Sequence, residues 1–210
     1  MSQSTVETPA SLWEQRKIEA MSRIQRVALD LFGEHGYREV TVEKVAAAAG
    51  VSPSSIYRYF GTKEMLVLYD EADPQVLEVL RDAGGGERLG FTELLALARP
   101  LIPVLTPVII TEELERRTRQ RMEYVLTIPE VRDRQLRQMR DLEDQFRLLF
   151  AERSGRDAND LTIRMAAATG IWSCVAALNH WAGTGFERPL VEVYSEALES
   201  VVDALEAIVG

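Results

Sequence analysis

Apolar residues recur with helical spacing along almost the whole chain, and this feature limits the fold more than any other. Side chains three, four, seven and eight residues apart share one face of an α-helix. The first such stripe consists of Ile24, Val27, Ala28, Leu31 and Phe32. No segment shows the clear two-residue alternation of a half-buried strand. The periodicity therefore predicts an all-α fold with about nine helices.

Capping residues, glycines and prolines set the expected helix ends. The first helix is expected to end at Gly36, and the others to span 41–49, 52–60, 63–80, 92 to the prolines, 106–126, 129–153, 161–181 and 189–209. Pro100, Pro103 and Pro107 are expected to break or kink the fifth helix, because proline removes a backbone donor and crowds the preceding turn.

Composition and charge describe a globular chain with an uneven charge distribution. The 210 residues are 46% hydrophobic and 27% charged, with a net charge of −9. Residues 11–63 carry a local balance of +2 and hold all three lysines, whereas residues 71–210 carry −8. An acidic surface is repelled by DNA, so only the N-terminal part is a credible docking face for nucleic acid.

The remaining bulk features predict a cytoplasmic protein. No run approaches the roughly 18 to 20 uninterrupted apolar residues of a membrane span, and no partner membrane is expected. Residues 1–15 are polar and are expected to form a disordered tail. The single cysteine, Cys174, has no partner for an internal disulfide and is expected in the core.

The stretch TVEKVAAAAGVSPSSIYRYFGTK, residues 41–63, predicts a helix-turn-helix. Two short helices flank a Gly-Val-Ser turn, and Val45 and Ile56 are placed to hold them together. The second helix of such a motif enters the major groove by its N-terminal end, which here is formed by Ser52, Pro53 and Ser54.

These residues resemble the DNA-binding domain of the TetR family of repressors. The resemblance covers about residues 24–66 and rests on the blocks LFGEHGY, TVEKVAAAAGVS and SIYRYFGTKEML. It implies a three-helix DNA-binding domain over residues 16–62, followed by a helical ligand-sensing and dimerisation domain over 63–210. It also implies a ligand-responsive regulator, most simply a repressor, that binds a palindromic operator as a homodimer.

The resemblance implies a set of DNA-binding residues, carried over by position. Helix-three residues read the operator, Tyr57 and Lys63 hold phosphates, and the start of helix two faces the DNA backbone. The full set is Thr41, Val42, Ser52, Pro53, Ser54, Ser55, Tyr57, Arg58, Tyr59 and Lys63. Arg58 is the best candidate for a base contact, since arginine donates two hydrogen bonds to guanine.

Some of these residues have simpler explanations. Ser52 could act only as a helix cap, and Tyr59 and Phe60 could pack against the first helix. Glu43 departs from a basic face and is expected to serve the dipole of helix two.

An enzyme and a helical interaction module are the alternatives. The two histidines, His35 and His180, lie in different expected domains, and no zinc-ligand spacing, G-x-S-x-G motif or P-loop is present. The sequence therefore predicts neither catalysis nor a cofactor. A module with a degenerate DNA-binding end would lack all specific DNA binding.

An arginine cluster at residues 116–121 could suggest a phosphate site. However, Glu112–Arg116, Glu113–Arg117 and Glu115–Arg119 have the spacing of stabilising helix pairs, which favours a solvated face with salt bridges. Glu130–Arg134 and Glu143–Arg147 repeat this spacing further along.

The last two helices are expected to form the dimer interface, since the TetR resemblance implies a four-helix bundle between subunits. The alternative is that they only close the core of one subunit. The residues assigned to the interface are Ile171, Val175, Leu178, Tyr194, Leu198, Val201, Val202 and Leu205.

The middle helices are expected to enclose an apolar cavity for a small effector. Each candidate could equally be ordinary core, and residues 117–181 resemble the acyl-CoA-like ligand-binding branch of the family only weakly. An acyl-CoA or another long-chain molecule is the expected ligand class. The candidate lining residues are Leu101, Leu105, Met122, Tyr124, Phe146, Met165 and Trp172.

Overall fold

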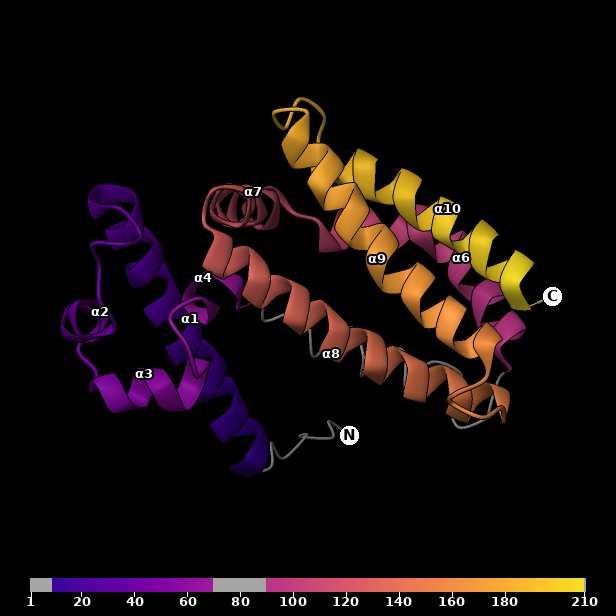
Figure 1. The fold of residues 1–210 in the computed structure, drawn as a ribbon, viewed down its shortest axis with the longest axis horizontal. Coiled ribbons are helices and arrows are strands. Elements are labelled where there is room, and N and C mark those ends of the chain that lie inside the picture. Colours follow the sequence, from indigo (N-terminus) through magenta and orange to yellow (C-terminus); the bar gives the residue numbers. More distant parts are fainter. Residues whose placement is uncertain (1–8, 70–89, 210) are drawn as a thin grey trace, which may run out of the picture. The chain divides into compact units, whose positions relative to one another are not determined.

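The computed structural model describes residues 9–69 and 90–209, and these residues form helices joined by short turns (Figure 1). The chain divides into two compact units, Met1–Asp73 and Pro74–Gly210. No strand occurs in the described ranges, so the all-α prediction is confirmed. The described helices are α1 (Pro9–His35), α2 (Val42–Ala49), α3 (Pro53–Phe60), α4 (Met65–Leu68), α6 (Phe91–Ile109), α7 (Glu112–Thr127), α8 (Pro129–Ser154), α9 (Leu161–Gly183) and α10 (Leu190–Val209).

The first unit packs α2 and α4 against α1, and α3 against α2. Its core includes Ile24, Phe32, Val45, Ile56 and Leu66, each almost fully buried. The expected α1 stripe is confirmed for Ile24, Ala28 and Phe32, which face this core. Helix α1 ends as predicted, because Gly36 takes a left-handed φ of +85° that glycine adopts without strain.

Two boundary predictions in the first unit are wrong. Residues 9–15, expected in a disordered tail, belong to α1, while residues 1–8 lie outside the described part. The helix expected over 63–80 is described only as the four residues of α4, and Tyr69 then leaves the helical conformation. The Gln25 side-chain amide on α1 donates to the carbonyl of Tyr69 at 2.8 Å, so this segment belongs to the first unit and the domain boundary lies after 62.

Helix α6 runs unbroken through its three prolines, contrary to expectation. Pro100, Pro103 and Pro107 all lie on its exposed side, where water can satisfy the carbonyls that lack an N–H partner. The opposite side, which carries Phe91 and Ile102, is buried and packs on α10. The next helix therefore starts at Glu112 rather than near residue 106, with Thr111 Oγ1 accepting from the backbone N–H of Leu114 at 3.2 Å.

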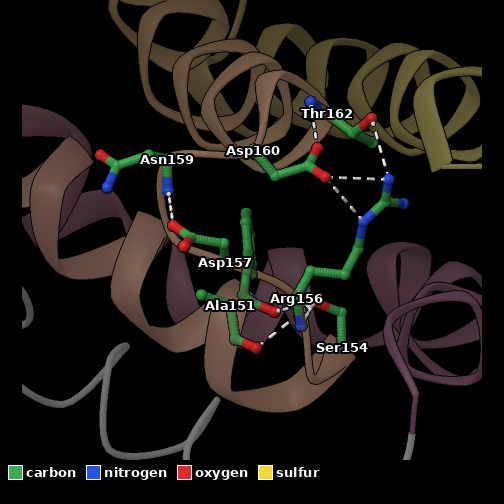
Figure 2. Close-up of polar contacts among 8 residues, drawn as sticks. Ala151, Ser154, Arg156, Asp157, Asn159, Asp160 and Thr162 are labelled. Carbon is green, nitrogen blue, oxygen red and sulfur yellow. Dashed lines mark hydrogen bonds and ion pairs between the residues drawn. The ribbon is translucent and has the colours of Figure 1, made fainter.

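The second unit is a bundle in which α9 packs on α7, α8 and α10, and α10 packs on α6 (Figure 1). The predicted bounds of α8, α9 and α10 agree with the structure to within two residues. The turn between α8 and α9 is polar, and Figure 2 shows how it ends. Asp160 caps α9 by accepting from the Thr162 backbone N–H at 2.8 Å, and Arg156 pairs with the same carboxylate.

The turn between α9 and α10 is tied to α7. The backbone N–H of Leu190, at the start of α10, donates to Glu115 Oε2 at 2.9 Å. The Arg119 guanidinium lies 4.6 Å from the centre of the Phe186 ring and 5.5 Å from that of Trp181. Phe186 has a φ of +60°, which is a strained conformation for a bulky residue. Together these contacts hold the turn in one conformation.

Five of the eight residues expected at the dimer interface are instead buried within their own chain. The cluster that α6, α8, α9 and α10 share contains Val201, Val202 and Leu205. Ile171 and Val175 on α9 are also buried. The remaining three, Leu178, Tyr194 and Leu198, are half-buried against the same core. An apolar stripe fits a core and an interface equally well, which is why the pattern misassigned these side chains.

Two of the described helices, α6 and α9, are apolar and long enough to cross a membrane by length and composition alone. Counting only uninterrupted apolar runs in the sequence did not detect them. Both pack against other helices of the second unit, which is the environment of core helices that pass the same test.

Candidate nucleic-acid interface

The N-terminal end of α2 is capped by its own side chains. Thr41 Oγ1 accepts from the Lys44 backbone N–H at 3.3 Å. Hydrogen bonds from its own backbone N–H and from the Thr41 hydroxyl hold the pKa of Glu43 below its usual value. Val42 is buried, so its side chain cannot reach DNA as expected. A phosphate contact at this end therefore depends on the backbone N–H groups of α2.

The turn between α2 and α3 requires Gly50. This residue has a φ of +65°, and its N–H bonds back to the last turn of α2. The N–H of Val51 donates to the Ala46 carbonyl at 3.0 Å, which closes the turn. Val45 and Ile56 are buried at the junction, as predicted, so the angle between the two helices is fixed by packing.

A group of hydroxyls forms the N-terminal end of α3. Ser52 caps the helix by accepting from the Ser55 backbone N–H at 3.2 Å. Its hydroxyl also lies 2.8 Å from the hydroxyls of both Ser54 and Ser55. Pro53 occupies the first turn, where its missing N–H costs nothing. The cap role of Ser52 is confirmed, and a phosphate contact by these serines stays a prediction.

Helix α3 has one buried and one exposed side. Ile56 and Phe60 are buried, as the packing alternative for Phe60 required. Pro53, Ser54, Tyr57 and Arg58 are all exposed and recur at helical spacing, so they form one surface. The exposed fraction of Tyr57 is 50%. We call these four residues the recognition face.

Arg58 and Tyr59 are partners at the end of this face. The Arg58 guanidinium lies 5.0 Å from the centre of the Tyr59 ring, and its Nη2 donates to the Tyr59 hydroxyl at 3.4 Å. Tyr59 is half-buried and can therefore support the arginine from the side. Such stacking limits the rotamers of Arg58 and lowers the entropy lost when its planar group binds a base.

Lys63 is held by the loop that precedes α2. Its Nζ donates to the Tyr37 carbonyl at 2.5 Å and lies 4.2 Å from the centre of the Tyr37 ring and 5.5 Å from that of Phe32. These contacts fix where the ammonium lies in the DNA-free protein. The role of Tyr37 was not recognised in the sequence, although the LFGEHGY block contains it.

Two family models match the chain. The model described as bacterial regulatory proteins, tetR family, matches residues 24–69, and the MftR C-terminal domain model matches residues 107–206. The chain belongs to the TetR family of transcriptional regulators. It is thus a DNA-binding regulator with a helix-turn-helix and not an enzyme.

Three similar TetR-family proteins cover most of the chain. A candidate mycofactocin biosynthesis transcriptional regulator, MftR of Mycobacterium tuberculosis, is 25% identical over 75% of this chain and 77% of its own length. NalD of Pseudomonas aeruginosa, the secondary repressor of the MexAB-OprM multidrug efflux pump, has a TM-score of 0.53 and 19% identity, with coverage of 89% and 96%. FadR of Thermus thermophilus in complex with lauroyl-CoA has a TM-score of 0.50 and 23% identity, with coverage of 88% and 94%.

In this TetR-family chain the seven candidate effector residues lie in different environments. Met122 is fully buried, whereas Leu101, Leu105 and Met165 have exposed fractions of 43–47%. Phe146 and Trp172 are half-buried, as is Tyr124, and burial raises the pKa of the Tyr124 hydroxyl. A lining role for Met122 would therefore require movement of its neighbours.

The arginine cluster on α7 forms salt bridges, as predicted, although not all expected pairs occur. Glu113 bonds both Arg116, at 2.8 Å, and Arg117, at 2.7 Å. Arg119 lies 3.6 Å from Glu115. The expected Glu112–Arg116 pair is replaced by the shorter connection three residues apart. The hollow beside these residues is lined by Glu112, Glu115, Arg116 and Arg119 and is therefore of mixed charge, unlike a phosphate site.

Proposed function

We propose that this regulator is a repressor that binds a near-palindromic operator as a homodimer and is released by a small apolar effector. The recognition face carries this proposal, because hydroxyls, Tyr57 and Arg58 lie exposed together on a helix rigidly set by Val45 and Ile56. Backbone contacts would position the helix, and Arg58 would read a base edge. The cytoplasm, where DNA is accessible, is the proposed location.

The dimer is proposed to form through the outward side of α9. Thr169, Ser173, Ala176 and His180 recur at helical spacing there, and none of them is buried within the chain. Their mostly small side chains would allow a second copy to approach closely. A two-fold interface would pair this side with itself and give two recognition helices for two half-sites.

The effector is proposed to be a long apolar molecule, with an acyl-CoA as the first candidate. Helix α6 leaves Leu97, Leu101, Val104, Leu105 and Val108 exposed, a larger set of exposed apolar side chains than a surface helix of a monomer needs. The 12 positions from Leu97 to Ile109 extend about 18 Å at 1.5 Å per residue. The lauroyl-CoA complex of the FadR neighbour supports a ligand of this kind.

Arg58→Ala is expected to lower operator affinity by about 1–3 kcal/mol and to relax specificity at one base pair. Selection from a pool of genomic fragments would supply the operator, and fluorescence anisotropy over a salt series would measure affinity. Lys44→Ala, at an exposed position near the motif, serves as the comparison for general loss of charge. Equal affinity of Arg58→Ala for cognate and mutated sites in the same ratio as the wild type would exclude base reading by Arg58.

Palmitoyl-CoA is expected to weaken operator binding about 5- to 150-fold, the range of typical coupling energies between two sites. The titration would compare it with coenzyme A alone and with planar aromatic drugs. Release by a drug and not by the thioester would replace the ligand class. An operator complex insensitive to every compound would leave a constitutive repressor.

A further inference from the structure

Glu143 forms an unexpected bond between α8 and α9. The indole Nε1 of Trp172 donates to Glu143 Oε2 at 2.7 Å. The pair Glu143–Arg147, expected from its spacing, is not formed, because Arg147 bonds Asp144 at 2.9 Å and the Ala158 carbonyl at 3.2 Å. Within residues 9–69 and 90–209, no ion pair involves Glu143. Its carboxylate is therefore half-buried beside an aromatic ring without a cationic partner.

This carboxylate lies where α8 is least tightly packed. Helix α8 is buried at Val131 and again from Leu149, and none of its described side chains between these points is buried. Phe146, one turn beyond Glu143, packs on the edge of the core formed with α6, α9 and α10. Trp172 is half-buried opposite, so Glu143 is a charged group at the margin of an incompletely packed apolar region.

We propose that Glu143 determines which acyl compounds this protein accepts. A free fatty acid would place a second carboxylate near Glu143, where the surrounding apolar groups strengthen repulsion between like charges. An uncharged thioester carbonyl suffers no such repulsion. Glu143 thereby rejects free acids and admits acyl thioesters, which is specificity through an unfavourable contact with the competitor. This role rests on the proposed apolar effector.

The test compares lauroyl-CoA and laurate by isothermal titration calorimetry with three full-length proteins. Glu143→Gln removes the charge but retains an oxygen that can accept the Trp172 hydrogen bond. Asp144→Asn is the matched control, because it removes the same charge from the adjacent, exposed position. Glu143→Met removes both charge and acceptor, so it separates the two contributions, and thermal melting would verify that every variant folds.

The wild type and Asp144→Asn are expected to bind lauroyl-CoA at least about tenfold more tightly than laurate, the effect of one unfavourable charge contact. Both Glu143 variants should gain about tenfold in laurate affinity and keep their lauroyl-CoA affinity. Unchanged laurate binding by folded Glu143→Gln, with lauroyl-CoA binding intact, would overturn the role of Glu143 alone. Binding of neither ligand by the wild type would overturn the acyl effector class together with it.

Discussion

Ala176→Asp is expected to give folded monomers that no longer bind the operator. Ala176 is exposed on α9, so a carboxylate there meets water in the isolated chain, and the loss of helix propensity costs only a few tenths to about 0.7 kcal/mol. In a two-fold dimer the same change places two charges against each other in a small-residue seam. Loss of the dimer removes the second half-site and with it most of the operator affinity.

Light scattering would measure the mass of Ala176→Asp, and circular dichroism its helix content. Ala207→Asp provides the control, because it makes the same substitution at an exposed position of α10, near the acidic residues Asp203 and Glu206. This variant should remain a dimer. A dimeric Ala176→Asp with intact operator binding would move the interface away from this side of α9.

Val201→Asp is expected to unfold the second unit rather than to separate subunits. Val201 is 7% exposed and packs in the core cluster with Phe91, Ile163 and Leu205. An unpaired charge buried there costs several kcal/mol, comparable with the roughly 5–15 kcal/mol that stabilises a typical domain. Thermal unfolding followed by circular dichroism should show loss of most helix at 25 °C.

Val201→Ala separates the loss of volume from the burial of charge. This change should cost about 1–3 kcal/mol and leave the fold intact. If Val201→Asp instead gives monomers with the melting temperature of the wild type, the original assignment of Val201 to the dimer interface is correct and its core role is wrong.

Local signals predicted the helix-turn-helix accurately, because each of its boundaries depends on one residue. Thr41 and Ser52 cap their helices, and Gly36, Gly50 and Gly61 all have a positive φ at a helix end. The same signals predicted α8 to α10. These features require only short-range chemistry, which is present in the sequence itself.

Features that depend on which side of a helix meets a neighbour were not predictable. The three prolines of α6 have the same local chemistry wherever they lie, and only their exposed position explains the unbroken helix. Likewise, the spacings from Glu143 and from Asp144 to Arg147 both suit an ion pair, and packing decided between them. Val42 was misplaced for the same reason, since its burial depends on how α2 sits on α1.

The tethered turn between α9 and α10 bears on domain exchange between subunits. Two helices joined by a loose turn can open into one long rod and trade partners, which is a common route to swapped dimers. Opening here would break the bond from the Leu190 N–H to Glu115 and remove Phe186 from Arg119. The α7 contacts therefore act as a lock on the hairpin, and two subunits would associate with each α10 still folded onto its own chain.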